Sequence, residues 1–317
     1  MTARAGVLLL DLGGPASPVE VRPFLRDLLS EPAVIGLPRP LSTLLASWIA
    51  ARRWRLVAAH YEAIGGRSPI HEGTAALAAA VAARLGAGIS VRHAFALSAP
   101  RIPDEVAGLV ASGARRIVAL PLFPQESRST TGVVLGAAAR AARGRAELVA
   151  VRSHAEAPGY VEALAQGILA RLDGADRVIA SAHGLPQKIA RRDGYVAEVE
   201  RTVAALGRRL AGRAQIALAY QSRLGRAEWT RPYLLDEIAR AAAEGTRRLV
   251  VAPISFACEN LETRYELDLE LPPLARAAGA ESIARAPAPG AHPAYAAALA
   301  ELAGAAAERP PEARRDA

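Results

Sequence analysis

One segment occurs twice in the chain, as DEVAGLVASGARRIVALP at Asp104–Pro121 and as DEIARAAAEGTRRLVVAP at Asp236–Pro253. The acidic pair, the glycine, the two arginines and the final proline recur 132 residues apart without a gap. Each copy joins a helical pattern to a short apolar run that is typical of a buried strand. Because charge, glycine and proline all stay in register, we interpret the repeat as a duplication that gives two similar α/β halves.

Short apolar runs bounded by glycine, proline or serine extend this pattern along the chain. They alternate with segments of helical periodicity, which predicts parallel sheets covered by helices on both faces. Ligands of such sheets bind beyond the carboxyl ends of the strands, so we expect the site in a cleft between the halves. The predicted strands are Gly6–Leu12, Ser90–Leu97, Arg116–Phe123, Ala146–Val151, Arg177–Ala182, Gln215–Tyr220 and Arg248–Phe256.

The two halves are predicted to occupy residues 1–155 and 156–307, and residues 308–317, rich in proline and charge, are predicted to be a disordered tail. The glycine turns that end the first strand of each half lie 170 residues apart rather than 132, so the first half carries an insertion. We place this insertion at residues 31–71. It contains an apolar stripe at helical spacing followed by arginines, and we expect it to form a lid over the cleft. An additional packing helix is the alternative interpretation.

The net charge of +8 at pH 7 favours an anionic partner. The arginines are scattered and only 4% of the residues are aromatic, so nucleic acid is not the expected partner. Cys258 is the only cysteine, which excludes a disulfide within the chain and an iron–sulfur cluster held by its own thiolates. We expect no permanently bound cofactor.

The first apolar run leads directly into a glycine turn, which is typical of a buried strand and not of a signal peptide. No uncharged apolar stretch approaches the roughly 20 residues needed to cross a bilayer. These features predict a cytoplasmic protein. The stripe of the insertion, which ends in Arg52, Arg53 and Arg55, also suits peripheral contact with a membrane surface. The residues specify no oligomeric state, and a monomer is the expectation.

His183 follows a predicted strand and precedes a Gly-Leu-Pro turn. The carboxyl end of a strand is where α/β proteins build their sites. A neutral imidazole at that place suits either a ligand of a divalent metal or a general base. A purely structural histidine is the alternative interpretation.

Glu262, Glu266 and Glu270 follow the strand of the second repeat copy at intervals of four residues. On a helix, this spacing stacks three carboxylates on one face. Such a row can bind a hard cation and pass protons outward. A solvated surface face is the alternative.

Six ordered motifs resemble those of the ferrochelatase family, and the resemblance covers nearly the whole chain. They are the opening at Leu8–Pro15 with Ser17–Pro32, HYEAIGGRSPI at His60–Ile70, LPLFPQESRSTTG at Leu120–Gly132, SAHGLP at Ser181–Pro186, YQSR at Tyr220–Arg223 with Trp229 and Pro232, and ETRYELD at Glu262–Asp268.

The chain also departs from the family pattern. Phe95–Pro100 reads FALSAP, without the arginine and tyrosine that members usually carry before this proline, so a polar anchor near the pocket is missing. Arg192–Tyr195 reads RDGY in place of the usual G-D-P-Y, Glu126 replaces a common aromatic residue, and Asn260 stands where some members have histidine.

The resemblance implies two Rossmann-like, chelatase-type halves with parallel sheets and a porphyrin in the cleft between them. It implies that His183 and Glu262 are the catalytic pair that handles the metal, and that Glu266 and Glu270 continue a path for protons or metal toward the surface. The residues that it implies for porphyrin binding are Arg52 and Arg53 near the propionates, Ser68, Leu12, Tyr220 and Trp229.

From this resemblance we expect the chain to insert Fe²⁺ into protoporphyrin IX, with iron and porphyrin as substrates. Our hypothesis is that His183 takes the pyrrole protons while Glu262, alone or with His183, receives iron. Leu12 favours protoporphyrin, because members that prefer coproporphyrin III tend to carry tyrosine in this turn. The alternatives are a coproporphyrin III ferrochelatase, a non-catalytic tetrapyrrole-binding protein, and a cobalt or nickel chelatase, whose short members lack the insertion.

Overall fold

The structure is a computed structural model that describes residues 5–175, 177–223 and 227–309. The tail predicted to be disordered, residues 308–317, lies outside the described residues except for Glu308 and Arg309.

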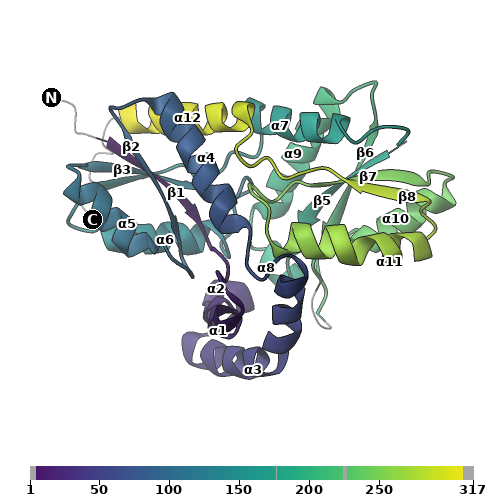
Figure 1. Cartoon of the computed structure of the whole chain (residues 1–317), viewed down its shortest axis with the longest axis horizontal. Coiled ribbons are helices and arrows are strands. Elements are labelled where there is room, and N and C mark those ends of the chain that lie inside the picture. Colours follow the sequence, from purple (N-terminus) through teal and green to yellow (C-terminus); the bar gives the residue numbers. More distant parts are fainter. Residues whose placement is uncertain (1–4, 176, 224–226, 310–317) are drawn as a thin grey trace.

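Two four-stranded parallel sheets form the framework, as the repeat predicts (Figure 1). The first has the order β2-β1-β3-β4 and the second the order β6-β5-β7-β8, which is the same order of first, second, third and fourth strand. Their bounds are Ala5–Asp11 (β1), Ser90–Phe95 (β2), Arg116–Pro121 (β3), Glu147–Ala150 (β4), Arg177–His183 (β5), Gln215–Gln221 (β6), Arg248–Pro253 (β7) and Ser282–Arg285 (β8).

The register of the central strands relates the halves residue by residue. Leu10 of β1 pairs with Pro121, and Ser181 of β5 pairs with Pro253. Because the two prolines are repeat partners, equivalent positions of β1 and β5 lie 171 residues apart, one more than the glycine turns indicate.

Helices cover both sheets, and the last of them crosses between the halves (Figure 1). α12, in the C-terminal part of the sequence, packs against α4 and β3 of the first half as well as against α7. The covering helices are Ile70–Leu85 (α4), Ile102–Ala111 (α5), Thr131–Ala142 (α6), Pro158–Leu169 (α7), Tyr195–Arg209 (α9), Leu234–Ala243 (α10), Leu271–Ala277 (α11) and Pro293–Glu308 (α12), and the short helix Gln187–Ala190 (α8) follows the end of β5.

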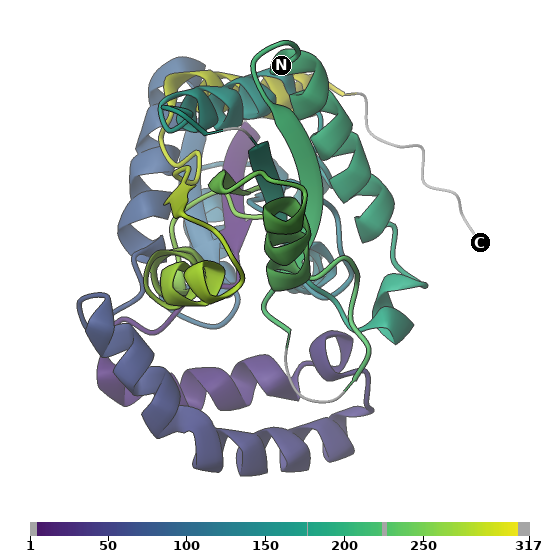
Figure 2. The ribbon, with the colours of Figure 1, turned by 90° about the vertical axis from the view of Figure 1, so that its right-hand side faces the viewer.

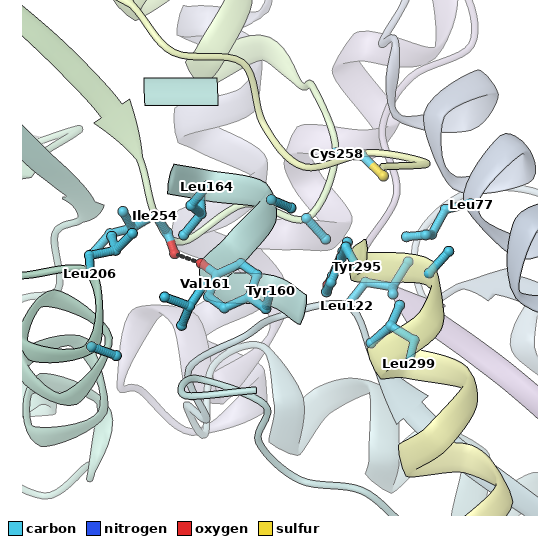
Figure 3. Close-up of a cluster of buried hydrophobic side chains, with 14 of the residues drawn as sticks. Leu77, Leu122, Tyr160, Val161, Leu164, Leu206, Ile254, Cys258, Tyr295 and Leu299 are labelled. Atoms are coloured by element: carbon cyan, nitrogen blue, oxygen red, sulfur yellow. Dashed lines mark hydrogen bonds between the residues drawn. The ribbon is translucent and has the colours of Figure 1, made fainter. Parts of the chain in front are cut away.

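One buried hydrophobic cluster joins the two halves (Figure 3). It combines Leu77 and Leu122 of the first half with residues of α7, β7 and α12. The hydroxyl of Tyr160 donates a hydrogen bond to the carbonyl of Ile254, and Tyr295 packs beside it, with the two ring centroids 5.5 Å apart. Burial of these side chains on both sides makes the halves a single packed body.

The insertion of the first half begins earlier than the predicted residue 31. It comprises a short 3-10 helix at Pro18–Glu20 and the helices Val21–Ser30 (α1), Pro32–Ile35 (α2) and Arg39–Ala63 (α3). α1 and α3 lie side by side beyond the ends of the sheets (Figure 2), and the hydroxyl of Ser42 donates to the carbonyl of Ser30 at 2.8 Å. The last residues of the predicted range open α4, which covers the first sheet.

The outer face of α3 leaves large apolar side chains in contact with solvent. The exposed members are Leu41, Leu44, Leu45, Trp48 and Leu56. None of the described helices combines the length and the apolar character needed to cross a membrane.

Candidate active site

A cavity of about 410 Å³ opens at the carboxyl ends of the strands of both sheets. The halves contribute the end of β1, the loop after β3, the end of β5 and the loop after β7, as predicted for the location of a site in parallel sheets. The insertion contributes the remaining wall. The residues of the halves that line the cavity include Asp11, Leu12, Ser127, Ser129, Thr130, His183, Tyr195, Trp229, Ser255, Phe256 and Glu262.

The wall contributed by α1 and α2 is entirely apolar. It consists of Phe24, Leu28, Leu29, Val34 and Ile35, all of which are only partly buried. The sequence patterns did not predict these residues as part of the site. For Phe24, Leu28 and Leu29 the signal is the strongly amphipathic pattern of α1, which lies before the range assigned to the lid, whereas Val34 and Ile35 of α2 fall inside that range.

His183 is the last residue of β5 and is held in one orientation. Its Nδ1 lies 2.7 Å from the carbonyl oxygen of Gly184. A carbonyl only accepts hydrogen bonds, so in the neutral ring Nδ1 carries the proton and Nε2 keeps its lone pair. The backbone is fixed as well, because the hydroxyl of Tyr195 donates to the His183 carbonyl at 2.8 Å and Ser255 Oγ accepts the His183 N–H at 3.3 Å.

Glu262 opens a π-helix that spans Glu262–Glu270. A reciprocal pair of hydrogen bonds fixes its start, since Asn260 N–H donates to Thr263 Oγ1 at 3.0 Å and Thr263 N–H donates to Asn260 Oδ1 at 2.9 Å. Within the described residues, no group donates a hydrogen bond to the Glu262 carboxylate. Its oxygens are therefore available to a ligand in the cavity.

Glu266 lies one turn further along the π-helix and has a different environment. Its Oε2 accepts hydrogen bonds from the Ser222 hydroxyl at 2.6 Å and from Gln221 Nε2 at 3.3 Å. Burial, and then the negative charge of Glu262, raise the pKa of the Glu266 carboxyl to about 7, against the opposing effect of these hydrogen bonds. Ser222 adopts a left-handed φ of 64°, so a strained backbone directs its hydroxyl at this acid.

Asp11 is a second acid on the cavity wall, and the sequence patterns did not predict it as a site residue. It ends β1, and its Oδ1 accepts the N–H of Gly13 at 3.2 Å. Burial raises the pKa of the Asp11 carboxyl to about 7; backbone N–H groups lower it and the charge of Glu262 raises it further. The rule that selected His183, a polar residue at the end of a central strand, also selects this one.

Comparisons with known proteins identify the family of the chain. The family model for ferrochelatase matches residues 4–307. The chain is 40% identical to the ferrochelatase of Phenylobacterium zucineum (strain HLK1) over 95% of this chain and 90% of that protein. It is 37% identical to the ferrochelatase of Synechococcus sp. (strain JA-3-3Ab) over 95% and 93%. The chain belongs to the ferrochelatase family. It is therefore a metal chelatase, an enzyme of the lyase class, as the resemblance implied.

Solved structures support the predicted fold of this ferrochelatase-family chain. SirB from Bacillus subtilis with Fe³⁺ aligns with a TM-score of 0.60 at 12% identity, covering 96% of each chain. CbiX, described as the terminal enzyme of sirohaem biosynthesis in denitrifying bacteria, aligns with a TM-score of 0.52 at 18% identity over 95% and 98%. The two similar chelatase-type halves are confirmed.

Of the site residues that the resemblance implies, five line the cavity: Leu12, Ser68, His183, Trp229 and Glu262. Tyr220 lies behind the wall, where burial raises the pKa of its phenol to about 12. Glu270 is exposed at the far end of the π-helix.

Arg52 and Arg53 are not among the residues that line the cavity. Both lie on α3, where the Arg52 guanidinium is 4.4 Å from the ring centre of Trp48 on the same helix. In this structure, Arg52 and Arg53 are therefore not placed to anchor a propionate inside the cavity, and other residues would have to do so.

In the described residues, no group of three or more His, Cys, Asp or Glu side chains is placed to hold a metal ion. His183 and Glu262 face the same cavity without a third protein ligand of these types beside them. Iron is a substrate of this family and leaves with the product.

Proposed function

We propose that the chain inserts Fe²⁺ into protoporphyrin IX to form protohaem. The observation that carries the choice of porphyrin is the apolar wall of α1 and α2, together with the absence of arginine and lysine from the described cavity lining. Methyl and vinyl groups suit such a wall. Coproporphyrin III carries two more propionates, and pressing carboxylates against apolar side chains without a partner is costly.

The proposed chemistry uses the two groups on the cavity wall in different ways. Two pyrrole N–H bonds break, their electron pairs stay on nitrogen to bind iron, and two protons must leave. The lone pair on His183 Nε2 takes the two protons one after the other, passing the first on before it accepts the second, and the Gly184 carbonyl at Nδ1 stabilises the imidazolium that forms each time. The Glu262 carboxylate, free of hydrogen-bond donors among the described residues, receives Fe²⁺ before it enters the ring.

Glu266 is proposed to pass protons outward. A carboxyl with a pKa of about 7 can both take and release a proton near neutral pH, which suits a relay next to Glu262. Glu270 is exposed at the surface end of the same helix and completes the proposed path.

The deciding experiment is anaerobic iron insertion followed by the shift of the Soret band. Wild-type protein is offered protoporphyrin IX and coproporphyrin III in parallel, and the Glu262→Gln variant is measured beside it. We expect preference for protoporphyrin IX and a loss of about 10²-fold or more in the variant. Faster insertion into coproporphyrin III would reverse the substrate assignment, and an unimpaired variant would remove Glu262 from the metal step.

We also propose that the exposed face of α3 contacts membrane surfaces, since Leu44 and Trp48 are more than half exposed and arginines follow on the same helix. The test is flotation with vesicles containing anionic lipid. Replacing Leu44 and Trp48 by serine should abolish flotation, and flotation unchanged by this replacement would contradict the proposal.

A further inference from the structure

A second hollow lies next to the cavity and differs from it in chemistry. It measures about 420 Å³ and is lined by polar and charged residues. The members are Glu126, Arg128, Arg152, Arg192, Asp193, Gly194 and Glu198.

The two hollows share their walls. In the loop after β3, Ser127 and Ser129 line the cavity, whereas Glu126 and Arg128 line the polar hollow. At the start of α9, Tyr195 lines the cavity, while Asp193 and Gly194 just before it line the hollow. The partition is one layer of loop, closed by a hydrogen bond of 2.9 Å from the Ser127 hydroxyl to a carboxylate oxygen of Asp193.

The acids of the polar hollow are all occupied by the protein. Glu126 accepts a hydrogen bond of 2.9 Å from Arg152 Nε, and Glu198 accepts one of 2.7 Å from Arg201. Glu198 also accepts the Glu126 N–H at 2.9 Å. Asp193 accepts the N–H of Arg128 at 2.8 Å in addition to the Ser127 hydroxyl. Little acceptor capacity is left over for further cations.

Two of the guanidinium groups that line the hollow, those of Arg128 and Arg192, are not engaged with these acids. In the part of the chain that the structure describes, neither the Arg128 side chain nor the Arg192 side chain has a hydrogen-bond or ion-pair partner. The three arginines and three acids that line the hollow balance in charge, but Glu126 is paired with Arg152 and Glu198 with Arg201 from outside the lining, so Asp193 is the one acid left opposite the two guanidinium groups. Two planar, permanently charged forks at one polar hollow are suited to a carboxylate, which guanidinium binds with paired hydrogen bonds.

We propose that Arg128 and Arg192 bind a propionate carboxylate of the porphyrin. This inference rests on the proposed function. A propionate places its charge two methylene groups beyond the ring, so the ring can stay in the apolar cavity while the carboxylate reaches the rim of the polar hollow. The arrangement separates the two edges of the substrate, with the apolar edge under α1 and α2 and the charged edge at the arginines.

The test compares protoporphyrin IX with its dimethyl ester, which has the same ring and no carboxylate. Arg128→Gln, Arg192→Gln and the double variant are titrated with each porphyrin by fluorescence, and zinc insertion is measured at saturation. Each single change should weaken binding of the dicarboxylate about tenfold, which is the loss of one charge-assisted hydrogen bond. Binding of the ester and kcat at saturation should stay within about twofold.

Arg191→Gln is the matched control, because Arg191 is an exposed arginine of the same turn that lines neither hollow. A double variant that binds the dicarboxylate like wild type overturns the inference and leaves metal insertion by the wild type, and with it the proposed function, intact. Equal weakening for acid and ester also overturns it, because the arginines would then act on the fold. If wild type binds no porphyrin, the proposed function itself fails.

Discussion

The two halves use one scaffold, yet they contribute differently to the cavity. The register of the central strands makes Leu12 the counterpart of His183, and the repeat offset of 132 makes Thr130 the counterpart of Glu262. All four residues line the cavity. Duplication therefore brings equivalent positions face to face, but only the C-terminal half provides an imidazole and a carboxylate at them.

The N-terminal half has specialised in the opposite direction. It keeps Asp11 where its counterpart is Ala182, and between its first two strands it carries α1–α3, where the C-terminal half has only the short α8. Under the proposed function, one half closes over the ring with apolar side chains, and the other supplies the groups proposed to handle metal and protons. We expect substitutions that make the halves more alike to affect these two tasks separately.

The largest effect is expected from His183→Leu, which gives the C-terminal half the residue of its counterpart. The variant loses the proton acceptor and should lower kcat for metal insertion by about 10²–10⁴-fold, while porphyrin binding changes little. Single-turnover zinc insertion at saturating porphyrin measures the loss. The control is Leu12→Ala, a change at the equivalent position without proton chemistry. A His183→Leu variant that keeps a tenth of the activity would show that the halves are not specialised in this way.

The fold and His183 were predictable because both depend on local patterns. An ungapped repeat of helix and strand defines two parallel sheets, and a polar residue at the end of a central strand points to the site. Asp11 satisfies the same rule, but a single aspartate before a glycine turn also suits a turn residue, so the pattern alone did not distinguish it.

The π-helix and the full lid were not predictable, because residues distant in sequence determine them. Glu262–Glu270 has the spacing of an α-helix. Arg285 at the end of β8 binds both ends of this region, at 2.9 Å from Nη1 to Glu259 Oε1 and at 2.9 Å from Nη2 to Asp268 Oδ2. α1 was assigned to the family opening, and only its packing on α3 shows that it belongs to the lid.

A smaller effect is expected from the core that the halves share. His154 lies there with its Nε2 2.8 Å from the Tyr295 hydroxyl, and burial lowers the pKa of its imidazole to about 3. The folded state thus binds this proton more weakly than the unfolded chain, so stability is full above the unfolded pKa of about 6.5 and falls as the pH drops toward 3. Between pH 7 and pH 5 the free energy of unfolding should fall by about 2 kcal/mol.

Urea denaturation at pH 7 and pH 5 measures this loss. In His154→Gln, the free energy of unfolding should differ less between pH 7 and pH 5 than in wild type. The difference should shrink by about 2 kcal/mol, whatever the variant's absolute stability. Equal pH dependence in variant and wild type would mean that the junction of the halves does not exclude the charged imidazole.

The smallest effect is expected where the specialised halves touch, at the end of α3. The His60 ring stacks on Tyr265 of the π-helix with ring centres 3.9 Å apart and an angle of 13° between the planes. The contact connects the lid of one half to the helix that carries Glu262 of the other. Because an aromatic pair contributes about 1 kcal/mol beyond its buried area, the double-mutant cycle of His60→Ala and Tyr265→Ala should give a coupling of that size.

Loss of this contact should raise the porphyrin KM about fivefold, because a loosened α3 holds α1 and α2 less firmly over the ring. Tyr265→Phe is the matched control, since it keeps the stacked ring and should behave like wild type. Additive single changes would mean that the lid and the π-helix move independently. A coupling seen in KM but absent from kcat is the result we expect, and it would locate the contact's role in closing over the porphyrin, apart from the metal step that we propose for His183 and Glu262.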